Sequence, residues 1–474
     1  MERLIIGRDN EKAVLQSIVE ERSAALVAIT GRRRIGKTYL IKSFFKEDYD
    51  FDYSGTFNGD MEFHLSTFAL KLNAYKNPQL KTIPTPSTWL DAFMLLQKQL
   101  AKIKTKKKLV VFIDEMPWID TPKSMFMMAF DWFWNTWAST QNIVVIICGS
   151  ATSWMIKKIL NNNGGLHNRV TSRIHLQPFT LSETKALLRH KNIVLSNYNI
   201  AELYMAFGGV PYYLNEVTKG ESTTQAIQRI CFAHNGLLTT EFDNLYRALF
   251  ANATTHIAIV KALGSKAKGL TRQEVLQLTK LQDGGSFTDI LQELEWCDFI
   301  QTCSPYGNLK KDTLYRLTDE FTLFYLKFMY KKKQINWQQF ADTPIWKTWC
   351  GYAFENLCIK HLPQIKKTLG IAGVHTNVCS YTAKANSTYN GVQIDVLIER
   401  RDGIINLCEM KFSSKPYTIT KNYATELRNK KGIFIERTKT QKPIFVTLVT
   451  AMGLHHNMWS SEAVQQQLVL DNLF

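Results

Sequence analysis

Several features that would mark a specialised protein are missing from this chain. None of its eight cysteines forms a C-x-x-C pair, so neither a zinc ribbon nor a thioredoxin motif is present. No apolar run approaches the ~18 residues of a membrane-spanning helix, and the apolar part of the N-terminus is too short for a signal peptide. Internal repeats are also absent. We therefore expect a cytoplasmic protein with no membrane partner and with buried, reduced thiols.

Acidic residues are scarce relative to basic ones. The 474 residues include 41 Asp and Glu against 58 Lys and Arg, which gives a net charge of +17. Such an excess favours a polyanionic partner, nucleic acid first and DNA in particular. The alternative is surplus lysine on solvated helix faces. At about 150 residues per domain, the length predicts about three domains.

The first part of the chain, up to about Ser182, alternates short apolar strands with helical stretches. This alternation predicts an α/β fold in which helices cover a parallel sheet. A mostly helical stretch follows to about Lys333, and from about Trp346 helices and strands mix again, with a linker expected at 330–344. The expected strands of the first part are Ala24–Thr30, Phe51–Tyr53, Leu109–Ile113, Val144–Cys148 and Arg173–Leu176.

A glycine-rich loop follows the first of these strands and matches G-x-x-x-x-G-K-[ST] completely. It reads Gly31-Arg32-Arg33-Arg34-Ile35-Gly36-Lys37-Thr38 and opens a helical stretch that begins with Tyr39. The glycines let backbone N–H groups face a phosphate chain, and the helix adds its positive N-terminal end. Lys37 would reach the outer phosphates of ATP, and Thr38 would bind Mg²⁺.

Two further strands end in groups that suit the same site. The strand Leu109–Ile113 is followed by Asp114, which would hold the Mg²⁺, and by Glu115, which would polarise the attacking water. The strand Val144–Cys148 leads to Ser150 and Thr152, either of which could sense the outer phosphate. Downstream, Arg169 or Arg173 would stabilise transition-state charge, with a surface arginine as the alternative.

These motifs together resemble the archaeal-type ATPase branch of the AAA+/STAND-like P-loop ATPases. The matching pieces include Ile6-Gly7-Arg8-Asp9-Asn10-Glu11, the P-loop, Ile113-Asp114-Glu115, Cys148-Gly149-Ser150 and Gly208-Gly209-Val210-Pro211. The resemblance implies a five-stranded core with the Asp-Glu strand beside the P-loop strand, and a helical lid. It places Arg8 and Glu11 near the adenine and Pro211 on the lid, while Ser150 stands where many relatives have Asn.

The middle of the chain reads as a helix, a turn and a second helix from Leu270 to Leu294. Gly284-Gly285 would lie in the turn, Ser286 would cap the second helix, and 300–317 would form the hairpin of a winged helix. The second helix carries Asp289, Glu293 and Glu295, which phosphates would repel. A scaffold or lever role is therefore favoured over reading of a DNA groove.

A second group of charged residues lies near the C-terminus. Asp395 lies in one apolar strand, and Glu409 and Lys411 share a face of the next, after the turn Arg401-Asp402-Gly403. With Glu355 from an upstream helix, Asp395 and Glu409 would bind Mg²⁺, and Lys411 would hold the attacking water or neutralise phosphate. The arrangement resembles the D…E-x-K core of restriction-endonuclease-like nucleases. A degenerate site or a charged structural hairpin are the alternatives.

The sequence thus predicts four parts: a P-loop ATPase core (1–180), a helical lid (181–245), a winged-helix-like domain (246–333) and a nuclease-like domain (345–474). The leading hypothesis is an ATPase that acts on DNA through a metal-dependent nuclease domain. The alternative is an ATP-dependent switch or scaffold whose nuclease-like domain binds but does not cut. A homo-oligomer is required if Arg169 or Arg173 acts in a neighbour's site, and is not if they act in cis.

Overall fold

The computed structural model describes residues 4–74, 84–160, 168–250, 252–307, 313–331, 335–383, 385 and 391–474. These residues divide into two compact units, one formed by 1–177 with 248–251 and the other by 178–247 with 252–474. All eight cysteines are free thiols and seven of them are buried, as predicted. Among the described residues, no helix is long and apolar enough to cross a membrane.

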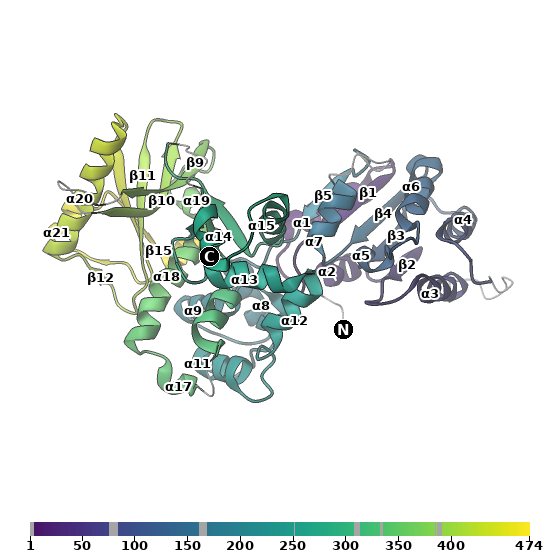
Figure 1. Ribbon diagram of the computed structural model, residues 1–474, viewed down its shortest axis with the longest axis horizontal. Coiled ribbons are helices and arrows are strands. Elements are labelled where there is room, and N and C mark those ends of the chain that lie inside the picture. Colours follow the sequence, from purple (N-terminus) through teal and green to yellow (C-terminus); the bar gives the residue numbers. More distant parts are fainter. Residues whose placement is uncertain are drawn as a thin grey trace. The chain divides into compact units, whose positions relative to one another are not determined.

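The first unit is built on a five-stranded parallel sheet (Figure 1). Every strand expected from the sequence is present, with bounds that differ by one residue at most. The sheet confirms the predicted α/β class for this part of the chain. Its elements are α1 (Asp9–Glu20), β1 (Ala25–Thr30), α2 (Lys37–Phe44), β2 (Phe51–Ser54), α3 (Met61–Ala74), α4 (Trp89–Leu100), β3 (Leu109–Asp114), α5 (Met116–Ile119), α6 (Phe126–Thr136), β4 (Ile143–Cys148), α7 (Thr152–Met155) and β5 (Ser172–His175).

The strand order corrects one expectation. The strands run β2-β3-β4-β1-β5, so β4 lies between the P-loop strand β1 and the Asp-Glu strand β3. The strands β1, β3 and β4 are buried along their whole length, and they are apolar except for Thr30 and Asp114 at their ends, because both faces of the sheet are covered by helices. The neighbouring position that the resemblance implied for β1 and β3 is therefore wrong, and strands this alike in sequence carry no signal of their own that would have corrected it.

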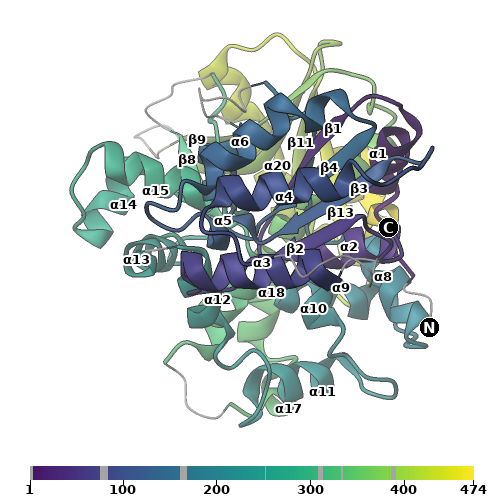
Figure 2. The ribbon, with the colours of Figure 1, turned by 90° about the vertical axis from the view of Figure 1, so that its right-hand side faces the viewer.

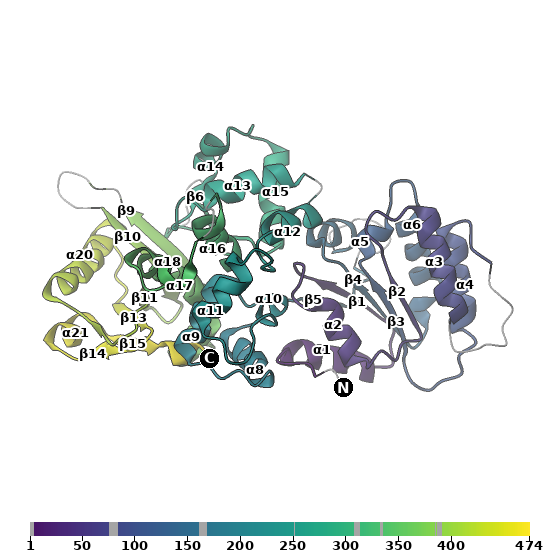
Figure 3. The ribbon, with the colours of Figure 1, turned by 90° about the horizontal axis from the view of Figure 1, so that it is seen from below.

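Helices cover both faces of this sheet (Figure 3). One face packs against α3, α4 and α6, whose aromatic side chains, among them Phe68, Phe93 and Phe133, form the larger core. Figure 2 shows α3 and α4 lying across that face. The other face packs against α1 and α2 through Leu15 and Ile41. Buried on both faces, the sheet is a rigid base for the loops that leave its carboxyl edge.

The second unit begins with helices. They are α8 (Leu181–His190), α9 (Asn197–Phe207), α10 (Pro211–Leu214), α11 (Thr223–Ile227), most of α12 (Glu241–Leu249), α13 (Ala253–Leu263), α14 (Arg272–Thr279), α15 (Gly285–Trp296), α16 (Glu320–Phe324), α17 (Trp337–Phe340), α18 (Pro344–Lys360) and α19 (Leu362–Thr368). The segment expected to be a linker contains α17, whose Trp337 is buried among aromatic rings.

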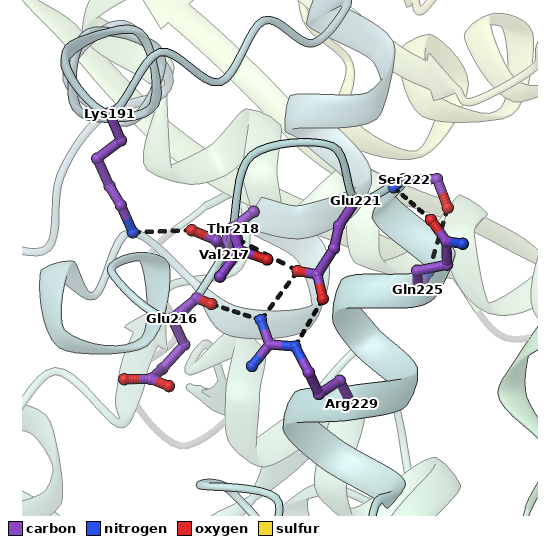
Figure 4. Close-up of polar contacts among 8 residues, drawn as sticks. All are labelled: Lys191, Glu216, Val217, Thr218, Glu221, Ser222, Gln225 and Arg229. Carbon is purple, nitrogen blue, oxygen red and sulfur yellow. Dashed lines mark hydrogen bonds and ion pairs between the residues drawn. The ribbon is translucent and has the colours of Figure 1, made fainter.

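An arginine fixes the loop between α10 and α11 (Figure 4). Arg229 donates through Nε to Glu221 Oε1 (2.6 Å) and through one Nη to Glu221 Oε2 (2.9 Å) and Glu216 O (2.6 Å). Lys191 Nζ donates to Val217 O at 2.8 Å. These contacts tie the loop to α8 and to the turn that follows α11. The hydrogen bonds from Arg229 lower the pKa of Glu221 to about 2.

Two sheets complete the second unit. The smaller has the order β6-β8-β7, from β6 (Leu270–Thr271), β7 (Ile300–Cys303) and β8 (Leu314–Leu317). It lies in sequence around α14 and α15. The helix α15 starts one residue before Ser286, after Gly284 as N-cap, so the expected cap by Ser286 is wrong. Ser286 is already a helical residue, and the extended backbone at Gly284 ends the turn instead.

The larger sheet is mixed, with the order β15-β13-β11-β10-β9. The antiparallel pair β10–β11 follows the register that the predicted turn implies, with Val396 opposite Cys408. Its helix α20 covers the face that carries Leu397 and Leu407 (Figure 1). The elements are β9 (Thr376–Ala383), β10 (Val392–Arg400), β11 (Ile405–Lys411), α20 (Lys421–Thr438), β13 (Ile444–Thr450), α21 (Met458–Ala463) and β15 (Gln466–Val469), with the short pair β12 (Tyr417–Thr418) and β14 (Leu454–His455).

Candidate functional site

The glycine-rich loop connects β1 to α2 in a shape that requires both glycines. Gly31 has φ +131°, and a Cβ there would lie 2.5 Å from the Leu176 carbonyl oxygen. Gly36 has φ +91° and is the N-cap of α2, which begins at Lys37. Other residues rarely adopt either backbone conformation. The loop therefore turns its backbone at the start of a helix, as a phosphate-binding loop must.

Lys37 and Thr38 lie at the first turn of α2. Lys37 is buried, and its Nζ donates to the carbonyls of Gly31 (2.7 Å) and Arg32 (2.9 Å). Thr38 Oγ1 donates to Asp114 Oδ2 at 2.8 Å. The hydroxyl and the carboxylate come from the two motifs that the sequence predicts to share a site. Both are oxygen ligands of the kind that Mg²⁺ prefers, so this pair fits the ion.

Glu115 follows Asp114 in a left-handed backbone conformation, with φ +47°. Its Oε2 accepts hydrogen bonds from the backbone N–H of Ser150 (3.0 Å) and from the Ser150 hydroxyl (2.9 Å). The end of β4 therefore holds the carboxylate at the carboxyl edge of the sheet. Ser150 was expected to sense a phosphate; in this structure it contacts the predicted base.

The remaining residues predicted for the nucleotide site lie around the loop. Arg8 is buried, and its guanidinium donates to the carbonyls of Gln177 (2.7 Å) and Ile35 (3.2 Å), so it ties the P-loop to the end of β5. Tyr39 is exposed, and its hydroxyl donates to the Leu4 carbonyl at 3.1 Å. Arg32 and Ile35 are buried, whereas Arg33 and Arg34 are partly exposed.

The two candidate arginines after β4 differ in their contacts. Arg169 is exposed, and its charge acts on Asp131 of α6. The net shift in the pKa of Asp131 is upward, because burial outweighs the lowering effects of Asn135 and Arg169. Arg173 lies on β5 and donates to the Leu160 carbonyl at 3.4 Å. Pro211 is the first residue of α10, in the second unit. Roles for these three residues in nucleotide binding stay predictions.

The C-terminal charged group is brought together in part. Glu409 and Lys411 share a face of β11, and Lys411 Nζ lies 3.7 Å from Glu409 Oε2. Asp395 lies where the register between β10 and β9 shifts, and Gln393 Nε2 donates to its Oδ1 at 2.7 Å. Glu355 of α18 faces Arg316, whose Nη2 lies 3.6 Å from Glu355 Oε2. Burial and, to a smaller extent, the negative charge of Asp395 raise the pKa of Glu355 to about 7.

Glu409 is held by a second helix that the sequence did not point to. Lys430 Nζ of α20 lies 2.7 Å from Glu409 Oε1, and the Tyr423 hydroxyl donates to Oε2 at 3.0 Å. Burial has the largest single effect on the pKa of Lys430 and lowers it, but charge and hydrogen bonds from Glu409 and Glu426 together outweigh burial, and the net shift is upward. Both residues come from α20, 14 and 21 positions after Glu409. Because the sequence is rich in lysine, a single lysine on a helix does not indicate that it will pair with Glu409.

The acids of this group do not form a metal centre in the described structure. Across the described ranges, no three His, Cys, Asp or Glu residues are grouped so that they could hold an ion. The Glu409 carboxylate faces two ammonium groups, which already balance its charge. The residues present therefore do not fit a bound divalent ion as they lie, and the metal-ligand roles of Glu355, Asp395 and Glu409 stay predictions.

Comparison with known proteins gives a match for the part of the chain that contains the first site. Residues 6–217 match the family model described as an ATPase domain predominantly from Archaea. The matched part spans β1 to β5 and continues through α10. This region of the chain therefore matches an archaeal-type ATPase domain, as the resemblance implied.

Individual relatives are distant. An uncharacterized protein of Methanocaldococcus jannaschii is 24% identical over 373 residues, 77% of this chain and 78% of that protein. Origin recognition complex subunit 1 of Debaryomyces hansenii is 20% identical over 52% of this chain and 31% of its own length. Among solved structures, a Walker-type ATPase of Pyrococcus abyssi has a TM-score of 0.49 and 17% identity, covering 68% of this chain and 96% of its own.

Proposed function

We propose that the chain binds and hydrolyses ATP at the P-loop site. The observation that carries this proposal is the 2.8 Å contact between Thr38 Oγ1 and Asp114 Oδ2. It joins the phosphate-binding loop to the acidic strand end, although β4 separates their two strands. Asp114 and Glu115 are consecutive residues at one edge of the sheet: Asp114 lies beside the ion position, and Glu115, held by Ser150, would accept a proton from the attacking water.

Each residue has a defined task in this proposal. The N–H groups of the loop and the start of α2 bind the phosphates, and Lys37 leaves the Gly31 and Arg32 carbonyls to contact the outer phosphates. A Mg²⁺ ion at Thr38 and Asp114 would neutralise charge on the phosphate oxygens. Glu115 accepts the proton of the attacking water as the water oxygen bonds to the γ-phosphorus and ADP leaves. Ser150 keeps Glu115 oriented until then.

The finer assignments extend this proposal. Arg8 braces the P-loop near the adenine side, Tyr39 contributes to the nucleotide site, and Pro211 belongs to a lid. Arg169 or Arg173 stabilises transition-state charge, in cis or in the site of a neighbouring copy. Mixing Lys37→Ala with Arg169→Ala or with Arg173→Ala tests the second case, because two inactive variants regain ATP turnover on mixing only when the arginine acts in a neighbour's site.

The same proposal gives the chain a nucleic-acid partner, DNA in particular. The net charge of +17 supports it, as do the 16 Lys and Arg against 9 Asp and Glu from Trp346 onward. For α14 and α15 we propose a winged-helix-like scaffold. Glu293 Oε2 lies 2.8 Å from His256 Nε2 of α13, and Glu295 Oε1 accepts a hydrogen bond from the Thr302 hydroxyl of β7 at 2.7 Å. Two acids of α15 therefore contact the neighbouring helix and strand.

Two activities remain for the C-terminal domain, namely cutting and binding without cutting. Cutting requires Glu409 to exchange Lys430 for a metal ion, and Asp395 and Glu355 to join it. Binding requires no such change. The ammonium groups around Glu409 favour binding, so we propose a nuclease-like domain that binds nucleic acid under the control of the ATPase.

Two experiments test these proposals. Glu115→Gln should abolish ATP turnover while fluorescent ATP still binds, and turnover equal to wild type would remove Glu115 as the base. Incubation of plasmid and linear DNA with Mg²⁺ or Mn²⁺, with and without ATP, should leave the DNA intact. Cleavage that is lost in Asp395→Ala and Lys411→Ala would show instead that the domain is a nuclease; cleavage that survives both would come from another source.

A further inference from the structure

A basic groove lies in the second unit, between α18, β8 and the loop after α13. Its volume is about 450 Å³, within the ~300–1,000 Å³ of pockets that hold small ligands. Four cationic residues line it: Lys266, Lys268, Arg316 and Lys327. Of the described residues that line it, none is acidic. One of the lysines, Lys266, is also paired with Glu274 at 2.9 Å. The groove is therefore suited to an anion.

Two residues that line the groove each carry a buried polar atom with no hydrogen-bond partner among the described residues. The atoms are Arg316 Nε and Asn356 Oδ1, on side chains that are 5% and 2% exposed. Another group of each side chain is engaged: Asn356 Nδ2 donates to the Thr318 carbonyl at 2.8 Å, and Arg316 Nη2 lies 3.6 Å from Glu355 Oε2. Buried polar atoms without partners are rare because they cost free energy. Because Arg316 and Asn356 both line the groove, a ligand that offers an acceptor and a donor would complement them.

Aromatic rings form another side of the groove. Trp349 is buried, whereas Tyr352, one turn of α18 further, is 51% exposed. A second cavity of about 300 Å³ shares Lys327, Trp349 and Tyr352 with the groove and extends along α18 to Pro344. Exposed rings beside cations are the surface on which unpaired bases stack while their phosphates are neutralised. In a duplex the base faces are covered, so a strand must be single to use such a ring.

We propose that the basic groove binds single-stranded nucleic acid, with a base on Tyr352, its polar edge at Arg316 and Asn356, and phosphates at Lys266, Lys268 and Lys327. This rests on the proposed nucleic-acid partner and names its form. The groove adjoins the predicted acids, because Gln393 lines it and donates to Asp395. A strand bound there passes the nuclease-like hairpin.

The test uses the full chain and a fluorescent oligodeoxythymidine of about 16 nucleotides, followed by anisotropy. Tyr352→Ala should weaken binding about 5- to 100-fold, Tyr352→Phe should not, and Lys268→Glu with Lys327→Glu should weaken binding and flatten its salt dependence. Phe63→Ala and Lys219→Glu are controls, as an exposed aromatic and an exposed lysine outside the groove. All variants should hydrolyse ATP in the absence of DNA at the wild-type rate, which shows that they fold.

The possible failures are distinguishable. If the wild type binds no oligonucleotide, the nucleic-acid partner itself is wrong. If it binds and the groove variants bind equally well, the partner stands and the groove assignment is overturned. Preference for a duplex of the same length, or displacement of the strand by free AMP at equal concentration, would also overturn it, in favour of a duplex surface or a mononucleotide site.

Discussion

The two acidic sites differ in what holds their carboxylates. At the P-loop, Asp114 and Glu115 accept hydrogen bonds from Thr38 and Ser150, which are neutral groups. At the C-terminal hairpin, Glu409 lies against the ammonium group of Lys430. A carboxylate that is hydrogen-bonded by neutral donors keeps its full charge and can attract a cation. A carboxylate that is already paired cannot do so without losing its partner. The comparison explains why only the first site fits a metal ion as it lies.

The largest expected effect is at the first site. Asp114→Asn removes the charge that would hold Mg²⁺ and should slow ATP turnover at least about 100-fold. The measurement is phosphate release over a Mg²⁺ titration. Thr136→Ala, an exposed threonine on α6, is the control and should have no effect. Turnover of Asp114→Asn near the wild-type rate would mean that the ion is held elsewhere.

At the second site the comparison predicts a loss of stability. Lys430→Met leaves the buried Glu409 with the Tyr423 hydroxyl and with the more distant Lys411 as its remaining described cation, and should lower the free energy of unfolding by about 3 kcal/mol. Adding Glu409→Gln should restore most of this loss because no charge is then left unpaired. Urea unfolding measures both, with Lys421→Met at the start of α20 as the control. A single variant as stable as wild type would show that Lys430 does not neutralise Glu409.

A third prediction concerns pH and the link between α8 and α18. His361 accepts a hydrogen bond from the Leu181 N–H at Nε2 (3.0 Å), and burial lowers its pKa to about 4. In the unfolded chain the imidazole of His361 takes up a proton near pH 6.5, whereas in the folded chain it does so only near pH 4. The contribution of the neutral ring to stability is therefore fully present above pH 6.5 and is lost as the pH is lowered toward 4.

The expected loss is about 3 kcal/mol over this range. Urea unfolding at neutral pH and near pH 4 should show a smaller loss in His361→Gln than in the wild type, with the exposed His190→Gln as the control. An equal loss of unfolding free energy in wild type and His361→Gln would mean that the folded chain already binds a proton at His361 in this pH range.

The smallest effect is expected in the loop before α11. Arg229 is partly exposed, so Arg229→Met should cost only about 1 kcal/mol at neutral pH (Figure 4). The depressed pKa of Glu221 means that its contribution is present above about pH 4.5 and is lost as the pH falls toward 2. Thermal unfolding of Arg229→Met and of Arg189→Met, a control on α8, measures the difference. If the loss of stability in Arg229→Met stays the same at acidic pH, the contribution of Arg229 does not depend on the charge of Glu221.

The sequence predicted most where backbone geometry alone decides the outcome. The P-loop glycines and the five strands follow from local rules, and parallel strands place their carboxyl ends at one edge, so Thr38, Asp114 and Ser150 had to lie close together. The shared face of Glu409 and Lys411 follows in the same way from the alternation of a strand. What such rules leave undetermined is the order of equally apolar strands, which is why β4 came between β1 and β3 unpredicted.

The rest depends on contacts between elements far apart in sequence. The register shift at Asp395 arises from its pairing with β9, a strand that was not predicted although Thr376, Val378 and Tyr381 are typical of strands. Lys430 reaches Glu409 only because α20 packs on that face of the sheet. Arg316 faces Glu355 for a similar reason, since β8 and α18 meet in the folded chain.

The most direct test of the account is ATP hydrolysis by the wild type and by Lys37→Ala, with Lys42→Ala on the same helix as the matched control. The P-loop assignment predicts that the wild type and Lys42→Ala hydrolyse ATP alike and that Lys37→Ala is at least about 100-fold slower. Hydrolysis by Lys37→Ala at the wild-type rate would contradict it.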